Sequence, residues 1–276
     1  MDQLFVRASI SRFLAEDLGA GDLTSGAIFS LGQMACAEFV AQVPMIAVGM
    51  STVAAQVFTI INPDVRIKAV ADGTIMTPGQ TALTVDGPVL DLLKAERVAL
   101  NLVQRLCGIA TLTAKFVNLI RPLPVKIADT RKTTPGLRQF EKYAVRVGGG
   151  HNHRFSLSDG VMIKDNHLAA AGSISKAVAM VRASIPHTLK IEVEAETLEQ
   201  VKECLDCGVE IILLDNMDCA TMRQAVMITD GRALLEASGG VNLSNVRQVA
   251  ETGVNIISIG ALTHSAPACD ISMRII

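Results

Sequence analysis

The sequence predicts an α/β protein with an N-terminal α+β unit and an incomplete or irregular (β/α) barrel of the TIM-like type. In the second half of the chain, short apolar runs end on charged, polar or glycine clusters, and amphipathic stretches lie between most of them. This pattern indicates buried parallel strands that alternate with helices. Six such runs are found, fewer than a complete TIM barrel contains: 125–132, 161–167, 189–196, 211–216, 233–240 and 255–261.

The residues before this region predict a separate domain built from shorter, mixed elements. Helices are expected over Ser11–Leu18 and over a segment that Ser51 caps and that ends at Ile60. Strands and turns follow from apolar patterning and from Asp-Gly pairs. The expected strands are Met34–Ala41, Ile46–Gly49, Val65–Val70 and Thr81–Val85, and the expected turns are Asp72-Gly73 and Asp86-Gly87-Pro88.

A strongly amphipathic segment then predicts a helix over Leu92–Leu106, with Arg97 on its polar side. Gly108 follows, and a second helix is expected over Thr111–Ile120. These elements predict three parts: an N-terminal domain at 1–111, the barrel at 112–267, and a C-terminal segment at 268–276 that returns to the N-terminal domain.

The composition is that of a globular protein. Half of the 276 residues are hydrophobic, 19% are charged and the net charge is −2, which argues against disorder and against a nucleic-acid-binding surface. No apolar run reaches the roughly 18 residues that span a bilayer, and the first residues lack the apolar core of a signal peptide. We therefore expect a cytoplasmic protein with no nucleic-acid or membrane partner.

The six cysteines are scattered along the chain and are expected to be reduced thiols. Cys204 and Cys207 form one C-x-x-C pair, which could belong to a zinc or redox site. No second pair stands at a suitable spacing for a zinc ion with four ligands.

Basic residues gather after the first two predicted barrel strands. Arg131 and Lys132 follow the first strand, and Arg154 and Lys164 lie beside or on the end of the next. Because the carboxyl ends of barrel strands meet at one mouth, up to four cations converge there. Like charges held together indicate a strongly anionic ligand, which arginine can bind through two hydrogen bonds and lysine as a point charge. The alternative is a solvated loop with a charge pair.

A glycine triplet, Gly148-Gly149-Gly150, precedes His151-Asn152-His153-Arg154. Glycine allows the backbone to approach a ligand or a neighbouring strand closely. The histidines alone could indicate a metal or nuclease site, or a structural histidine in the core. We favour a role for His153 in the active site because Arg154 adjoins it.

Carboxylates and glycines end the later strands. Glu192 and Glu194 alternate on one strand and so face the same side, and Asp215 ends the next strand. Glu194 and Asp215 suit either Mg²⁺ or a pair of sugar hydroxyls. The last two strands end in Ser238-Gly239-Gly240 and Ile259-Gly260-Ala261, where backbone N–H groups commonly bind phosphate. The alternative is that these glycines only form turns.

In combination, these motifs resemble the quinolinate phosphoribosyltransferase family, also called nicotinate-nucleotide pyrophosphorylase (carboxylating). The matching segments run in order from Glu16 to Ser272, and DTRKTTPG together with GGGHNHR is the most specific part. The others are EDLGAGDLTS, AERVALNLVQRLCGIAT, EKYAVRV, IKDNH, IEVE, LLDN, LEASGG and SIGALTHSAPACDIS.

The resemblance implies an enzyme of NAD biosynthesis that transfers a phosphoribosyl group from phosphoribosyl pyrophosphate to quinolinate. The products are nicotinate mononucleotide, pyrophosphate and CO₂, and Mg²⁺ is the implied cofactor. It also implies a fold, an N-terminal α/β sandwich domain followed by an irregular, open (β/α) barrel of the TIM-like type. The implied assembly is a homodimer with shared active sites, in which one subunit's N-terminal domain covers the partner's barrel mouth. Larger assemblies of dimers occur in the family, and a hexamer of dimers is a further assembly to consider for this chain.

The motifs also imply roles for individual residues. Lys132, Glu194 and Asp215 would be catalytic, and Glu194 and Asp215 would also hold the metal. The quinolinate carboxylates would bind Arg131, Arg154 and Lys164, with His153 close by and with Arg97 supplied by the partner subunit. The 5′-phosphate would bind the last group: Ser238, Gly239, Gly240 and Gly260, with His264 near by.

Three other functions stay open at this point. A paralogue associated with molybdenum transport shares the fold, although the complete RKTTPG, HNHR and KDNH motifs argue against it. A phosphate-binding aldolase or epimerase barrel would explain the glycine motifs but not the cations. A non-catalytic binding or scaffold protein is the third alternative.

Overall fold

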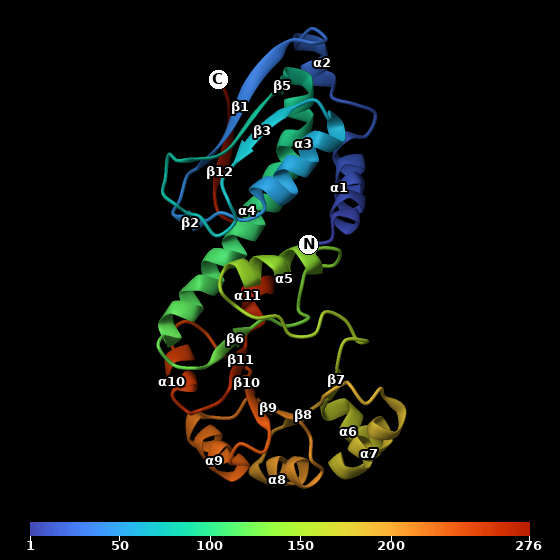
Figure 1. Ribbon diagram of the computed structural model, residues 1–276, viewed down its shortest axis with the longest axis vertical. Helices are drawn as coiled ribbons and strands as arrows, with labels where there is room; N and C mark the ends of the chain where they lie inside the picture. Colours follow the sequence, from blue (N-terminus) through green and yellow to red (C-terminus); the bar gives the residue numbers. More distant parts are fainter. The chain divides into compact units, whose positions relative to one another are not determined.

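Figure 1 shows the computed structural model of the chain, which describes residues 1–276. The chain divides into two compact units. Unit 1 consists of Met1–Leu112, Thr134–Gly149 and Ser265–Ile276, and unit 2 consists of Thr113–Thr133 and Gly150–His264.

Unit 1 is built on an antiparallel sheet with the strand order β12-β1-β5-β3. These strands are β1 (Met34–Ala41), β3 (Arg66–Ala69), β5 (Thr81–Pro88) and β12 (Ile271–Ile275), and a second small sheet pairs β2 (Met45–Ile46) with β4 (Ile75–Met76). The helical segments that belong with them are α1 (Gln3–Leu18), α2 (Leu23–Ile28), the π-helix η1 (Met50–Ala54), α3 (Ala55–Ile61) and α5 (Arg138–Val147). Helix α4 (Val89–Ile120) belongs to unit 1 as far as Leu112, and its remaining residues belong to unit 2.

Aromatic side chains mark the core of unit 1. Phe39 on β1 and Phe58 on α3 are buried with their ring centroids 5.8 Å apart. Phe140 on α5 is also buried, and its ring lies 5.6 Å from that of Phe5 and 6.5 Å from that of Phe13 on α1. This packing explains why α5 belongs to unit 1, although the sequence placed its residues within the barrel domain at 112–267.

Two further features of unit 1 concern its ends. Strand β12 pairs with β1, from Ala37 opposite Ile275 to Ala41 opposite Ile271, so the C-terminal residues complete the sheet. Helix α1 begins earlier than expected because the Asp2 side chain caps it by accepting a hydrogen bond from Phe5 N at 2.8 Å.

Gly49 and Gly87 account for two local differences from the sequence prediction in this unit. Gly49, in the left-handed region with φ 80°, precedes η1, so Ser51 is not the helix cap. The Asp86-Gly87-Pro88 segment is not a turn, because β5 continues through it opposite β1. A Cβ on Gly87 would lie only 2.7 Å from Val65 Cγ1, so close packing, and not a reversal of the chain, requires this glycine.

Helix α4 is a single helix of 32 residues, where the sequence suggested two helices separated near Gly108. A Cβ on Gly108 would lie 1.9 Å from the carbonyl oxygen of Pro267. The glycine is therefore needed for the close approach of the segment at Pro267 and does not break the helix.

Unit 2 contains a six-stranded sheet in the order β6-β11-β10-β9-β8-β7, with parallel pairs throughout. The strands are β6 (Lys126–Ala128), β7 (Val161–Ile163), β8 (Ile191–Ala195), β9 (Ile211–Asp215), β10 (Leu234–Ser238) and β11 (Ile256–Ser258). The six strands lie within the six apolar runs that the sequence indicated, and the open, barrel-like α/β class is confirmed.

Helices connect these strands and lie along the outer side of the curved sheet (Figure 1). They are α6 (Asp165–Ala171), α7 (Ile174–Ser184), α8 (Leu198–Asp206), α9 (Cys219–Thr229) and α10 (Val246–Ala250). The short helix α11 (Ala261–His264) follows β11, the last strand of this sheet in the chain. Val193, Ile212 and Leu214 are completely buried, as expected for strands covered by helices. None of the helices of the chain is both long and apolar enough to cross a membrane.

Replacing Gly108 by alanine should destabilise unit 1, because a methyl group cannot fit against the Pro267 carbonyl. We expect a loss of about 1–3 kcal/mol in the free energy of unfolding, measured as a lower urea midpoint. Gly26→Ala is a matched control: Gly26 lies in α2 with open space around it, and alanine there should be neutral or slightly stabilising. An unchanged midpoint for Gly108→Ala would contradict the packing described here.

Candidate active site

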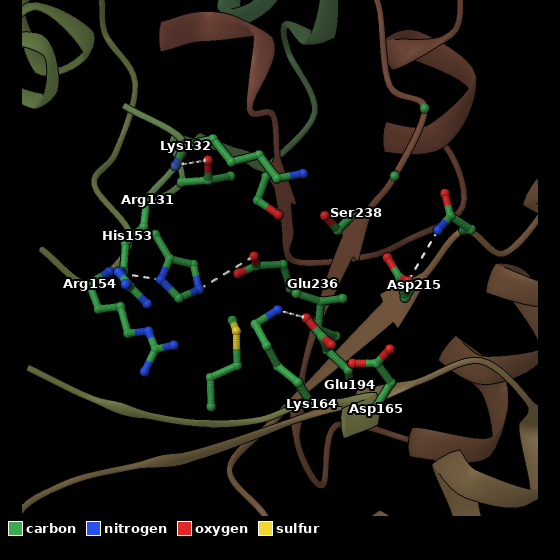
Figure 2. Close-up of a pocket in the computed structure, with 17 residues that line it drawn as sticks. Arg131, Lys132, His153, Arg154, Lys164, Asp165, Glu194, Asp215, Glu236 and Ser238 are labelled. Atoms are coloured by element: carbon green, nitrogen blue, oxygen red, sulfur yellow. Dashed lines mark hydrogen bonds and ion pairs between the residues drawn. The ribbon is translucent and has the colours of Figure 1, made fainter. Parts of the chain in front are cut away.

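A cavity of about 510 Å³ lies at the carboxyl ends of the strands of unit 2 (Figure 2). It collects ten of the residues that the sequence singled out, together with seven others. The ten are Arg131, Lys132, His153, Arg154, Lys164, Glu194, Asp215, Ser238, Gly239 and Gly240. The seven are Thr130, Met162, Asp165, Leu213, Asn216, Glu236 and Ser258.

Arginines form one side of the cavity (Figure 2). Arg131 follows β6, and Arg154 lies in the loop before β7, where its Nη1 donates a hydrogen bond to Gly160 O at 2.8 Å. Burial, followed by repulsion from Arg131, lowers the pKa of the Arg154 guanidinium. The two positive charges therefore repel each other, and an anion bound between them would offset this repulsion.

The turn that carries Arg154 is attached to the end of β6. His151 forms a parallel bridge with Ala128. The Asp129 side chain is completely buried, and its Oδ1 accepts a hydrogen bond from His153 N at 2.9 Å while its Oδ2 accepts one from Asn152 Nδ2 at 2.6 Å. Asp129 thus fixes the His-Asn-His-Arg turn beside the loop of Arg131.

Carboxylates form another part of the wall. Glu194 is the penultimate residue of β8, and Lys164 Nζ donates a hydrogen bond to its Oε1. Asp215 ends β9, and its Oδ2 accepts a hydrogen bond from Asn216 Nδ2 at 3.1 Å. A smaller cavity of about 240 Å³ is lined by four carboxylates, those of Asp165, Glu194, Glu196 and Asp215.

A glycine loop follows β10, opposite the end of β9. Ser238 lies opposite Asp215 in the sheet register, and Asn216 N donates a hydrogen bond to Ser238 O at 3.0 Å. Gly239 has a φ of 95°, and a Cβ on it would lie 2.1 Å from Asn216 Oδ1. Only glycine can therefore take this position, which brings the backbone of the loop to the cavity surface.

Two predicted residues lie next to the cavity and do not line it. A Cβ on Gly260 would lie 3.0 Å from His264 Nε2 and 3.1 Å from Lys132 Cδ. The Thr263 hydroxyl donates a hydrogen bond to the Lys132 carbonyl at 2.8 Å. The segment with Gly260 and His264 thus packs against Lys132, a cavity residue.

The last predicted residue, Arg97, belongs to unit 1. It is an exposed residue on α4 and is not among the residues that line the cavity of unit 2.

Several cavity residues were not singled out from the sequence. Met162 and Leu213 are apolar and were read only as strand residues. Glu236 and Ser258 were missed because only the residues at the carboxyl ends of their strands were considered as site residues. A usable signal existed for Glu236: it is a charged residue inside an apolar strand, two positions before Ser238, and so faces the same side of the sheet.

At the cavity wall, the His153 ring lies beside two buried glutamates, Glu192 and Glu236. Its Nε2 lies 3.0 Å from Glu192 Oε2 and 3.7 Å from Glu236 Oε1, and Figure 2 shows His153 and Glu236 turned toward each other. Arg154 N donates a hydrogen bond to His153 Nδ1 at 2.7 Å. Both ring nitrogens of His153 therefore face protein groups, although its ring also lines the cavity.

Comparisons with known proteins agree with this geometry. Residues 22–107 match the family described as quinolinate phosphoribosyl transferase, N-terminal domain, and residues 109–274 match its C-terminal domain. A Mycobacterium leprae protein named nicotinate-nucleotide pyrophosphorylase (carboxylating) is 44% identical, over 97% of this chain and 96% of its own length.

Solved structures show the same likeness. The NadC structure from Streptococcus pyogenes is 40% identical with a TM-score of 0.96, covering 99% of this chain and 97% of that one. Nicotinate-nucleotide pyrophosphorylase from Ehrlichia chaffeensis is 39% identical with a TM-score of 0.92, covering 97% of each chain. With both domains matched and the cavity residues in place, the chain belongs to the quinolinate phosphoribosyltransferase family.

Proposed function

We propose that the cavity of unit 2 catalyses phosphoribosyl transfer from phosphoribosyl pyrophosphate to quinolinate, with loss of CO₂, giving nicotinate mononucleotide for NAD biosynthesis. Family membership supports the reaction. The observation that carries the assignment of substrates is the division of one cavity into a cationic side, a carboxylate side and a glycine loop. These three parts suit a dicarboxylate, a sugar with its leaving group, and a phosphate.

The cationic side is proposed to bind quinolinate. Arg131, Arg154 and Lys164 would pair with its two carboxylates, and Lys132 lies on the same cavity wall. A dianion offsets the repulsion between Arg131 and Arg154. His153 is proposed to hold this wall in place, because its ring nitrogens already face Arg154 N and Glu192.

The remaining wall is proposed to bind phosphoribosyl pyrophosphate. Backbone N–H groups of Ser238, Gly239 and Gly240 would bind the 5′-phosphate, since a left-handed glycine loop exposes such groups. Gly260 and His264 support this end of the cavity from beside Lys132. Glu194 and Asp215 would accept hydrogen bonds from the ribose hydroxyls.

Magnesium is proposed as the cofactor, and the donor groups fit it. Mg²⁺ prefers oxygen ligands. Four carboxylates line the small cavity, and Glu194 and Asp215 are two of them. We propose that Glu194 and Asp215 hold the ion. When bound, it would offset the negative charge of the departing pyrophosphate.

The side chains of the cavity would act mainly by positioning. Holding the ring nitrogen of quinolinate against the anomeric carbon converts an encounter into a unimolecular step, which supplies a large part of the barrier reduction. The carbon–oxygen bond to pyrophosphate breaks with oxocarbenium character, as in other glycosyl transfers. The ring then carries a positive nitrogen, which stabilises the electron pair left on carbon 2 when the carbon–carbon bond breaks and the 2-carboxylate leaves as CO₂. A proton from solvent then adds to carbon 2 and completes nicotinate mononucleotide.

We further propose a homodimer with shared active sites, in which Arg97 contributes to the site of the partner subunit. Arg97 is exposed on α4 of unit 1 and is not among the residues that line the cavity of unit 2. We also propose a cytoplasmic location. All six cysteines are free, which suits a reducing compartment.

The direct test of the function is an assay of the purified protein with quinolinate, phosphoribosyl pyrophosphate and Mg²⁺. We expect nicotinate mononucleotide and CO₂ in equal amounts, and loss of activity when a chelator removes the metal. Nicotinate should be a poor substrate, because a missing 2-carboxylate leaves the cations of the cavity partly unpaired. Comparable turnover of nicotinate would contradict the assignment to quinolinate.

Arg131→Ala and Arg154→Ala should each weaken quinolinate binding strongly without unfolding the protein. Loss of a charge-assisted contact to a desolvated carboxylate should cost about 1.5–3 kcal/mol, or roughly 10- to 150-fold in Kd. Titration calorimetry measures the change. Arg223→Ala, which removes an exposed arginine from α9, is the matched control. Wild-type affinity in either cavity variant would remove that residue from the site.

A mixing experiment tests the shared site. Arg97→Ala and Lys164→Ala dimers should both be inactive, while subunit exchange should restore about one quarter of wild-type activity. Random exchange makes half of the dimers mixed, and each mixed dimer has one intact site of two. If Arg97 acted in its own subunit, every site would keep a lesion. No recovery after verified exchange would therefore reject the shared site.

A further inference from the structure

The cluster formed by His153, Glu192 and Glu236 is not explained by the proposed reaction. Glu192 is 4% exposed and Glu236 is 3% exposed. The facing atoms of the three side chains all lie within 4.8 Å of one another. Glu192 Oε1 and Glu236 Oε1 are both buried and have no hydrogen-bond partner. Two acidic groups thus lie close together, out of water, and one of them, Glu236, lines the cavity proposed to bind a dianion.

The hydrogen bonds of His153 assign its proton. Because Arg154 N donates to Nδ1, that nitrogen is an acceptor, and the proton of the neutral ring is on Nε2. A metal ion at Nε2 would require the proton on Nδ1, where it would face the N–H of Arg154. The geometry therefore favours a hydrogen-bonded cluster over a metal site.

The same hydrogen bond distinguishes the two glutamates. Nε2 lies 3.0 Å from Glu192 Oε2, within hydrogen-bond distance, but 3.7 Å from Glu236 Oε1, which is too long. Glu192, and not Glu236, therefore accepts the hydrogen bond from His153. Ionising both of these buried, neighbouring carboxyl groups would cost free energy, so we infer that one of them keeps its proton. We place the proton on Glu236, because it lacks the hydrogen bond from His153 Nε2.

The surroundings of Glu236 agree with this assignment. Burial, and then repulsion from Glu192, raise the pKa of Glu236 to about 7, while His153 and a hydrogen bond with Ser258 act in the opposite direction. The charged and titratable groups facing it are Glu192 from β8, His153 from the turn, and Asp129 after β6. Its register neighbour on β9 is the apolar Leu213.

The charge of Glu236 matters because this residue lines the cavity. As an anion it would repel a bound dicarboxylate, whereas as an acid it can donate a hydrogen bond to one. We propose that Glu236 is a specificity-determining residue that acts as a neutral carboxylic acid, so that quinolinate binds together with one proton. This inference rests on the proposed function and adds a group that the cation cluster alone does not supply.

Calorimetric titration of the full-length protein with quinolinate, without the second substrate or metal, tests the inference. Titrations in two buffers with different ionisation enthalpies count the protons taken up. We expect close to one proton at pH 8 and much less at pH 6, where Glu236 already carries it. The apparent Kd should be about tenfold weaker at pH 8 than at pH 6, in proportion to the protonated fraction.

Glu236→Gln is the informative variant, since its amide can donate a hydrogen bond but cannot ionise. It should bind quinolinate with a Kd that is nearly the same at pH 6 and pH 8 and should lose the proton uptake. Glu199→Gln, an exposed change at the start of α8, should behave like wild type. Uptake that persists in Glu236→Gln, or wild-type binding at pH 8 without uptake, would overturn the inference.

Thermal unfolding gives a second measurement that does not depend on binding. A carboxyl whose pKa is raised on folding contributes stability that is present below about pH 4.5 and is lost as the pH rises toward 7. The Tm difference between Glu236→Gln and wild type should therefore shift in favour of the variant from pH 5 to pH 8. A constant difference would count against a protonated Glu236. Wild-type protein that bound no quinolinate at pH 6 would instead reject the proposed function.

Discussion

The buried carboxylate of Asp129 is the interaction on which the cavity depends. A charged group without contact to water is costly unless hydrogen bonds compensate it. Asp129 accepts such hydrogen bonds from the backbone of His153 and the side chain of Asn152. If the turn moved away from β6, the buried carboxylate would lose both of these hydrogen bonds. Because Arg131 follows Asp129 and Arg154 follows His153, one anion fixes the positions of two cavity cations.

Carboxylates near the cavity offset part of the repulsion among its cations. Lys164 pairs with Glu194 at the surface of the cavity. Glu192 and Glu194 raise the pKa of Arg154, against the effects of burial and of Arg131. These partners offset only part of the repulsion, which leaves the arginines suited to a further anion. The neutral state inferred for Glu236 follows the same logic, since a full charge there would compete with the ligand for the same cations.

The sequence predicted the parts of this protein that depend on local patterns. Apolar runs located all six strands of unit 2, and the charged or glycine residues after them located most of the cavity. Patterns failed where a distant segment decides the outcome: Gly108 looked like a helix break until Pro267 was seen to pack on it, and α5 joins unit 1 through Phe5 and Phe13. Glu236 was missed for a related reason, because only the fold places it against Glu192 and His153.

The incomplete sheet of unit 2 explains why the cation cluster forms where it does. Strands β6 and β7 follow each other among the strands of this sheet, yet they are its two edges, with four strands between them. The connection between them passes through α5 of unit 1, and the chain returns to unit 2 at Gly150. The bridge between Ala128 and His151 places the returning segment beside the β6 edge, from which it leads to β7 at the other edge. Arg154 therefore enters the cavity from the gap that a closed barrel would fill with strands. The missing strands leave room for a side chain that binds the substrate, so in this fold the irregularity of the barrel is part of the site.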